Sequence, residues 1–146
     1  MKLKIINTSG YPNPDYNGEG NSGMDIRTCI KEPVTLNSLE RKLFPTGIKI
    51  EIPIGYEIQV RPRSGLALKK GITVLNTPGT IDASYQGEIG IVLVNLSKEP
   101  VTINPGDRIA QLVLSKVEIS EGFEEIEFFE QTTARGEGGY GSTGIQ

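Results

Sequence analysis

The stretch IKIEIPIGYEIQVR, residues 48–61, decides the fold, because polar and apolar side chains alternate along it in two runs. Isoleucines alternate with charged residues over 48–52. The same alternation returns over 56–60, after the turn signal Pro53-Ile54-Gly55. A period of two places one side of a strand in a core and the other side in solvent. The stretch therefore predicts two consecutive β-strands.

Strand patterns continue on both sides of this stretch. Residues 2–6 also alternate, and a continuous apolar run over 89–94 is typical of a strand buried on both faces. The run over 109–113 is similar, although it contains Gln111. Further turn signals separate these runs, namely Thr77-Pro78-Gly79 and Asn104-Pro105-Gly106-Asp107. Many short strands at this spacing predict an all-β sandwich or barrel.

The remaining segments predict one helix and a distinct C-terminus. Ser64–Lys70 is the one segment that favours a short helix, with Ser64 as its N-cap. Glu118–Glu130 carries six glutamates and no basic residue, and the Gly-rich segment that follows cannot build a core. We therefore expect one β-domain over residues 1–134 and a flexible C-terminal arm over 135–146.

Composition limits the chemistry. The 146 residues include no His and a single Cys, Cys29, so a carboxylate is the expected acid–base catalyst and Mg²⁺ the expected metal. The net charge of −3 argues against a duplex nucleic-acid partner. No apolar run is long enough to cross a bilayer, and the N-terminus lacks a signal-peptide core, so a cytoplasmic location is expected.

Two early segments carry candidate ligand contacts. Asp25 stands between apolar neighbours and could hold a metal through water, although an exposed strand aspartate without a role is the simpler interpretation of this residue alone. Arg63, Ser64 and Gly65 stand where a helix begins, and free backbone N–H groups with a guanidinium suit phosphate oxygens. A capped turn with a surface arginine explains the same residues equally well.

The segment Asn76–Glu88 predicts a β-hairpin with Pro78-Gly79 at its tip, whose free backbone groups could pair with a flat base. Asp82 is the best candidate for a carboxylate base. Tyr85 offers a flat face to a sugar or base. Gly90 indicates a close backbone approach or a bulge. An ordinary hairpin with a solvated aspartate is the alternative.

The last two candidate segments lie further along the chain. Gln111 interrupts an apolar strand, so its amide is either a structural bridge or a ligand contact, and neighbouring Asp107 and Arg108 suggest a local structural ion pair. The Gly-rich tail, with Arg135, Ser142 and Thr143, could wrap a polyphosphate, but a disordered tail is the simpler interpretation. The tail lacks the sequence of a P-loop.

Together and in this order, the five segments resemble the five motifs of the trimeric dUTPase family. The resemblance extends from about Ser22 to Gly144 and rests on RSGLA (63–67), IDASYQGE (81–88), GDRIAQ (106–111) and RGEGGYGSTG (135–144). It implies a jelly-roll-type β-barrel, a homotrimer with active sites at subunit interfaces, and Mg²⁺-assisted hydrolysis of dUTP to dUMP and pyrophosphate. In a cell this activity limits uracil incorporation into DNA and supplies dUMP for dTMP synthesis.

The resemblance also implies residue roles. Asp82, Gln111 and Arg135 would be catalytic, with Asp82 activating the water that attacks the α-phosphorus. Tyr85 would pack on the deoxyribose and exclude a 2′-hydroxyl, and Asp25 would orient Mg²⁺ through water. The other implied contacts are to uracil from Asn76, Thr80, Ile81, Asp82 and Gly90, to the phosphates from Arg63, Ser64, Gly65 and Gln111, and from the arm Arg135, Tyr140, Gly141, Ser142 and Thr143.

This sequence departs from the family pattern in three places. Tyr140 stands where the family usually has Phe, Ser22-Gly23-Met24-Asp25 replaces a common Ala-Gly-x-Asp, and residues 10–21 are longer and more polar than expected. Two other interpretations remain open at this point. A dCTP deaminase shares the fold but differs after its Arg-Ser-Ser segment and has a catalytic Glu in the hairpin region. A binding module would keep the fold without catalytic activity.

Overall fold

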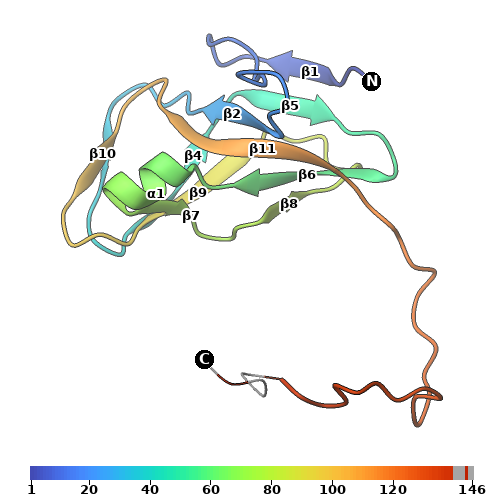
Figure 1. Ribbon diagram of the computed structural model, residues 1–146. Helices are drawn as coiled ribbons and strands as arrows, with labels where there is room; N and C mark the ends of the chain where they lie inside the picture. Colours follow the sequence, from blue (N-terminus) through green and yellow to red (C-terminus); the bar gives the residue numbers. More distant parts are fainter. Residues whose placement is uncertain (140–143, 145–146) are drawn as a thin grey trace.

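The structure is a computed structural model, which describes residues 1–139 and residue 144. Within them nearly all regular structure is β-strand, which confirms the predicted all-β class (Figure 1). The elements in chain order are β1 (Lys4–Asn7), β2 (Gly23–Arg27), β3 (Val34–Leu36), β4 (Arg41–Pro45), β5 (Ile48–Glu51), β6 (Tyr56–Arg61), α1 (Ser64–Lys70), β7 (Ile72–Val74), β8 (Gly79–Ile81), β9 (Gly90–Asn95), β10 (Val101–Ile103) and β11 (Arg108–Lys116).

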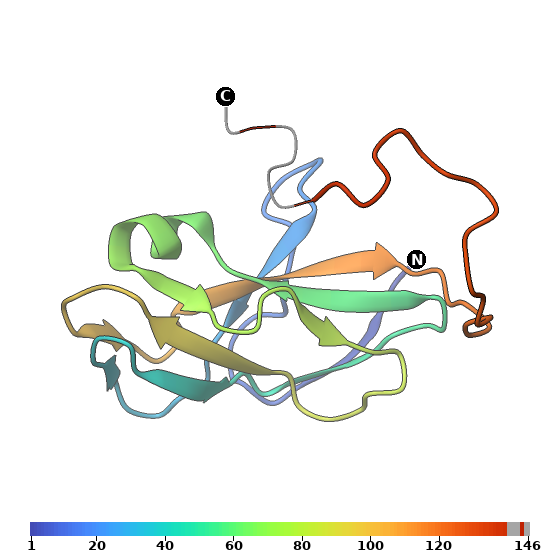
Figure 2. The ribbon, with the colours of Figure 1, turned by 90° about the horizontal axis from the view of Figure 1, so that it is seen from below.

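Two larger antiparallel sheets enclose the core. One has the strand order β2-β11-β6-β8 and the other β4-β9-β7, while β1 pairs with β5 and β10 with β3. Figure 2 shows β11 and β6 on one side of the molecule and β4 and β9 on the other. The hydrogen-bonded sheets stay separate and do not close into one continuous barrel.

Alternation along the strands fills the core between these sheets. On β6, Ile58 and Val60 are buried, while Glu57, Gln59 and Arg61 face outward. Burial of one such aliphatic side chain contributes about 1.5–3 kcal/mol. The largest side chains that are almost completely buried include Phe44, Ile26, Leu36, Ile72, Ile91, Leu93, Ile109 and Leu112. The period-two pattern therefore predicted the core face of β6 correctly.

The helix α1 has the predicted bounds, but its predicted N-cap was wrong. Arg63 is the N-cap residue, with an extended backbone (φ −91°, ψ 127°), and no side chain caps the helix. Ser64 already has helical geometry, because the chain turns one residue earlier than predicted. Gly71 ends the helix at φ 66°, and a Cβ there would lie 2.9 Å from the Ser97 backbone nitrogen, so glycine is required at this position.

The predicted hairpin with Pro78-Gly79 at its tip was also wrong. Strand β7 pairs with β9 and strand β8 pairs with β6, so residues 75–78 cross from one sheet to the other. The tight turn comes later, where the Tyr85 backbone nitrogen donates to the Asp82 carbonyl over 3.0 Å. Turn residues and alternation mark where strands lie, but they do not specify which strands pair.

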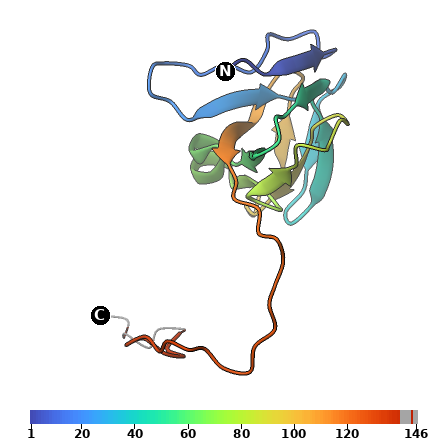
Figure 3. The ribbon, with the colours of Figure 1, turned by 90° about the vertical axis from the view of Figure 1, so that its right-hand side faces the viewer.

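After β11 the described chain leaves the sheets and extends away from them (Figures 1 and 3). Residues 118–137 are exposed. Among them are the large apolar side chains Ile119, Phe123, Ile126, Phe128 and Phe129. Soluble proteins rarely expose several large apolar side chains along one segment, so this segment is suited to packing on another surface. Within the described residues, the structure contains no helix of the length and apolarity needed to span a membrane.

Candidate active site

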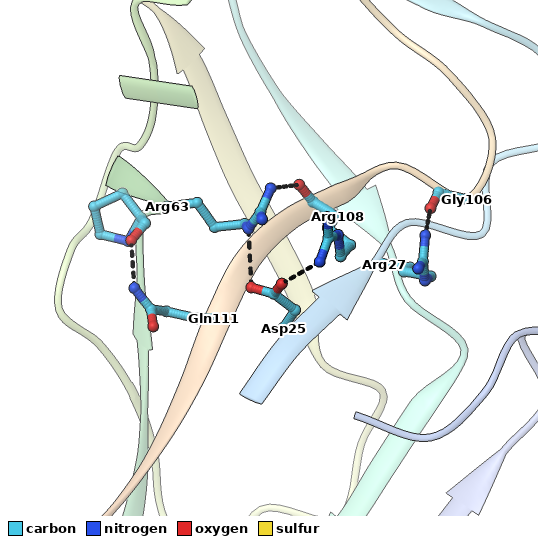
Figure 4. A network of polar contacts seen from close by, with 7 residues as sticks. Asp25, Arg27, Arg63, Gly106, Arg108 and Gln111 are labelled. Carbon is cyan, nitrogen blue, oxygen red and sulfur yellow. Dashed lines mark hydrogen bonds and ion pairs between the residues drawn. The ribbon is translucent and has the colours of Figure 1, made fainter. Parts of the chain in front are cut away.

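A carboxylate between two guanidinium groups forms the first part of the site (Figure 4). Asp25 projects from β2. Its Oδ1 accepts a hydrogen bond from Arg63 Nε at 2.9 Å, and its Oδ2 accepts one from Arg108 Nη1 at 3.0 Å. Arg63 Nη1 also donates to the Arg108 carbonyl at 3.2 Å. We call Asp25, Arg63 and Arg108 the arginine cluster. It carries one net positive charge and keeps guanidinium N–H groups free, as an anion-binding site requires.

A β-bulge brings Arg108 into this cluster. The register between β11 and β2 shifts between Arg108 and Ala110, so Ile109 has no opposing residue. Ile109 and Ala110 are consequently both buried, and Arg108 comes to the outer face beside Asp25. The predicted local ion pair between Asp107 and Arg108 was wrong. Asp107 instead accepts a hydrogen bond from the Asn104 backbone nitrogen at 2.8 Å.

Gln111 lies on the same outer face, opposite Asp25 on β2 and Arg61 on β6. Its Nε2 donates to the Pro62 carbonyl at 3.0 Å, so the amide is a structural bridge to the segment that carries Arg63. Its Oε1 lies against Gly23, where any Cβ would collide with it. Gly23 therefore leaves the room that the amide needs.

The start of α1 borders the arginine cluster. Ser64 and Gly65 are exposed, and a Cβ on Gly65 would meet no atom within 4 Å. The first intrahelical bond joins the Ala67 nitrogen to the Arg63 carbonyl at 3.0 Å. The N–H groups that precede Ala67 have no partner within the helix and remain available to an anion.

The second part of the site is the loop between β8 and β9. Asp82 follows β8 and is exposed. Tyr85 lies over Gly87, where a Cβ would collide with its ring, and its hydroxyl donates to the Glu88 carbonyl at 2.8 Å. The Tyr85 side chain, which is 46% exposed, is therefore held in one orientation with a face open to a ligand.

The other residues predicted to contact uracil lie along the strands that flank this loop. Thr80 and Ile81 belong to β8. Asn76 precedes β8, and a Cβ on Gly79 would lie 3.4 Å from its Nδ2. Gly90 begins β9 without a bulge, and its nearest neighbour is the Leu43 side chain, whose Cδ1 would lie 2.7 Å from an added Cβ, so the predicted backbone approach or bulge was wrong.

Glu88 is a residue whose role sequence reasoning missed. Its Oε1 accepts hydrogen bonds from the backbone nitrogens of Thr46 and Gly47, at 3.0 and 2.9 Å. The Thr46 hydroxyl in turn donates to the Ile89 carbonyl at 2.5 Å. These bonds join the Tyr85 loop to the turn before β5. A glutamate directly after Gly87, at the end of a polar loop, was the available signal.

The two parts of the site lie at opposite ends of β6. Ile81, next to Asp82, pairs with Ile58 near the start of β6, whereas Gln111 pairs with Arg61 at its end. These two pairings lie three residues apart along β6, which is about 10 Å at roughly 3.3 Å per residue. Asp82 and the arginine cluster therefore lie apart in one chain.

Arg135 lies in the extended C-terminal segment, outside both parts, and its Nε donates to the Gly138 carbonyl at 2.8 Å. Four predicted contacts, Tyr140, Gly141, Ser142 and Thr143, lie outside the described residues. The single cysteine is not part of the site either. Burial, with the nearby Glu88 carboxylate as the next cause, raises the pKa of the Cys29 thiol above its ordinary value. This favours an unreactive thiol.

Within the described residues, no group of three or more acidic or sulfur side chains could hold a metal ion directly. Asp25 is the carboxylate nearest to the expected phosphate site, and each of its oxygens already accepts a guanidinium N–H. A carboxylate oxygen has a second lone pair for a water molecule. The residues therefore fit a metal that arrives with a polyphosphate and contacts Asp25 through water.

The fold and these two groups of residues define a small all-β protein equipped to bind a phosphorylated ligand. Residues 10–144 match the dUTPase family model. The chain is 56% identical over 144 residues to proteins named deoxyuridine 5′-triphosphate nucleotidohydrolase from Fusobacterium nucleatum and from Finegoldia magna. The match covers 99% of this chain and, respectively, 97% and 99% of those relatives.

Comparison with solved structures also gives dUTPases. A mutant dUTPase of Staphylococcus bacteriophage 80alpha with dUpNHpp superposes with a TM-score of 0.84 at 28% identity, covering 99% of both chains. A mutant dUTPase of phage phi11, described with a structural Mg(II) ion, gives a TM-score of 0.78 at 26% identity, covering 90% of this chain and 100% of that one. The chain belongs to the dUTPase family, and this membership favours the hydrolase over the deaminase alternative.

Proposed function

We propose that the chain hydrolyses dUTP to dUMP and pyrophosphate with the help of Mg²⁺. The observation that supports this proposal is the arrangement of two groups of motif residues. Guanidinium groups and exposed backbone N–H groups gather near α1, and an exposed aspartate and a fixed tyrosine ring lie on the loop after β8. The family relatives bear the name of the same activity.

The arginine cluster and α1 are suited to the triphosphate. Arg63 uses Nε and Nη1 for contacts within the protein, which leaves Nη2 for a phosphate oxygen. The exposed backbone of Ser64 and Gly65 adds N–H donors beside it. Gln111 holds this segment through Pro62, so its phosphate role combines with the structural bridge. Charge-assisted hydrogen bonds of this kind supply both orientation and charge neutralisation.

Asp82 is the proposed general base. The chain has no histidine, and Asp82 is exposed at a strand end, where a water molecule can reach it. The carboxylate would take a proton from the water that attacks the α-phosphorus. Tyr85, fixed over Gly87, would pack on the deoxyribose and exclude a sugar with a 2′-hydroxyl.

Mg²⁺ would neutralise the triphosphate charge and favour departure of pyrophosphate. Asp25 would hold it through a water molecule. The same carboxylate also fixes the two arginines, so it would link the metal with the phosphate-binding guanidinium groups.

The active unit is proposed to be a homotrimer with sites between subunits. Two observations support this assembly. The two parts of the site lie at opposite ends of β6 in one chain. In addition, the segment after β11 exposes Phe123, Ile126 and Phe128, which are suited to packing on a neighbouring subunit. Residues 1–134 would form the body of each subunit, and residues 135–146 a C-terminal arm that would bring Arg135 to a site.

The direct test is release of pyrophosphate from dUTP by the purified chain, measured with Mg²⁺ and after chelation with EDTA. We expect release of pyrophosphate and dUMP that depends on Mg²⁺. Asp82→Asn is the matched control for a contaminating phosphatase, because the amide keeps the size and shape of the side chain but removes its charge. Release of ammonia from dCTP, or no product from either nucleotide, would contradict the proposal.

A further inference from the structure

The orientation of the Arg63 side chain depends mainly on Arg108. Its Nη1 donates to the main-chain carbonyl of Arg108, and its Nε donates to Asp25, which the Arg108 side chain holds from the other side. Both fixed nitrogens of Arg63 therefore depend on where Arg108 lies (Figure 4). Since Nη2 is the group left for a phosphate, a displacement of Arg108 would misdirect it.

The turn that precedes Arg108 fixes its position. Gly106 and Asp107 exchange backbone hydrogen bonds with Thr28 at 3.1 and 3.0 Å, and Arg27 Nη1 donates to the Gly106 carbonyl at 2.6 Å. Asp107 closes the turn through its bonds with Asn104. These contacts hold one side of the turn against the end of β2.

Tyr11 supports the other side of the same turn. A Cβ on Gly106 would lie 2.8 Å from Tyr11 Cε1 and 2.9 Å from its Cζ, so the tyrosine ring packs against the Gly106 backbone. Gly106 has a φ of 80°, as the third residue of a turn with proline in second place requires. The absence of a side chain at Gly106 thus serves the turn and makes room for the ring.

The polar N-terminal loop holds Tyr11 in place. The loop follows β1 and folds back on Asn7, whose Nδ2 donates to the Tyr11 carbonyl and to Asn13 Oδ1, both at 2.8 Å. Asn7 Oδ1 accepts from the Ser9 nitrogen and hydroxyl, and Ser9 Oγ accepts from the Tyr11 nitrogen at 3.0 Å. The bond from the Thr8 nitrogen to the Gly47 carbonyl attaches the loop to the turn before β5. Such a network is ordered enough to support a neighbouring turn.

We propose that Tyr11 is a positioning residue for phosphate binding, which acts through the turn at Gly106 and through Arg108 on the guanidinium of Arg63. This inference rests on the proposed function and gives a role to the polar loop after β1. Tyr11 need not touch the nucleotide. Its effect should fall mainly on the phosphates, because the Tyr11 ring packs on the Gly106 turn, whereas its loop meets the Tyr85 loop only indirectly, through Gly47 and Glu88.

The test compares two ligands that share the nucleoside. Dissociation constants are measured for a non-hydrolysable imido analogue of dUTP and for deoxyuridine, which has no phosphate. For Tyr11→Ala we expect binding of the analogue to weaken by about tenfold, the order of one charge-assisted hydrogen bond, with unchanged deoxyuridine binding. Tyr11→Phe should keep wild-type affinity, because it retains the ring atoms Cε1 and Cζ, which lie nearer to the Gly106 position than the hydroxyl does. Tyr16→Ala, an exposed tyrosine of the same loop, is the matched control.

A double-mutant cycle with Arg108→Gln separates positioning from general destabilisation. If Tyr11 acts through Arg108, the double variant binds the analogue no more weakly than Arg108→Gln alone. Additive losses, or equal losses for deoxyuridine and the analogue, would overturn the inference. If Tyr11→Ala does not fold, Tyr11→Leu replaces it in the same cycle. Absence of dUTP hydrolysis by the wild-type chain would instead refute the proposed function, so the two failures are distinguishable.

Discussion

Asp82 is exposed at the end of β8, in a chain without histidine. We expect Asp82→Asn to fold and to bind the imido analogue normally, because the amide keeps the size of the carboxylate. Its hydrolysis of dUTP should be slower by about 10²–10⁴-fold, the usual contribution of a general base. Single-turnover hydrolysis beside a binding titration measures both quantities. A near-normal rate would place the base elsewhere.

Gly87 determines where Tyr85 lies. Because a Cβ at this position collides with the tyrosine ring, Gly87→Ala should displace Tyr85 and open space for a 2′-hydroxyl. The preference for dUTP over UTP, as a ratio of kcat/KM values, should fall by about tenfold or more. Tyr85→Ala should have a similar effect. Ser84→Ala, an exposed neighbour, is the control and should leave the ratio unchanged. An unchanged ratio in both test variants would show that Tyr85 does not select the sugar.

At the residue scale the motifs predicted candidate side chains but not the contacts that those side chains make. Asp25 and Gln111 were both identified, but their partners Arg63, Arg108 and Pro62 come from strands and segments far apart in the sequence. A motif specifies residue types and spacing, whereas these contacts depend on strand register. The bulge at Ile109, which inverts the alternation along β11, leaves no period-two signal.

At the scale of elements, the described C-terminal segment makes few contacts with the sheets. We expect removal of residues 135–146 to leave the melting temperature nearly unchanged, since Arg135 bonds only to Gly138 within the described residues. Hydrolysis should nevertheless fall by about 10³-fold, mainly in kcat, as when a mobile arginine is removed from other phosphate-transfer sites. Arg135→Ala should reproduce much of the loss. Full activity after truncation would show that the arm has no catalytic role.

The sequence predicted those elements whose signal lies within their own residues. The strands β5 and β6 and the helix α1 follow directly from alternation and from Ser64–Lys70, and the structure contains them. The crossing at residues 75–78 was predicted as a hairpin, because proline and glycine signal a turn without showing which sheet continues after it. The pairing of β8 with β6 depends on contacts between residues far apart in the sequence. It buries Ile81 on the core face while Asp82 stays exposed.

At the scale of the whole molecule, the separation of Asp82 from the arginine cluster along β6 decides how an active site can be completed. If each site takes Asp82 from one subunit and Arg63 from a neighbour, no subunit needs both residues intact. Asp82→Asn and Arg63→Gln should each form trimers with little activity. Trimers refolded from an equal mixture of the two variants should then contain some sites in which both Asp82 and Arg63 are intact.

Such mixed trimers should recover about a quarter of wild-type activity, since a working site needs an intact Asp82 from one subunit and an intact Arg63 from the next. Assay of pyrophosphate release after co-refolding, with sedimentation to confirm the trimer, measures this recovery. The control is a mixture of the same two variants without unfolding, in which subunits do not exchange and activity should stay low. A subunit that built the whole site by itself would carry one defect in every site, so the co-refolded mixture would remain inactive. Recovery is therefore expected only if Asp82 of one subunit lies beside Arg63 of a second copy.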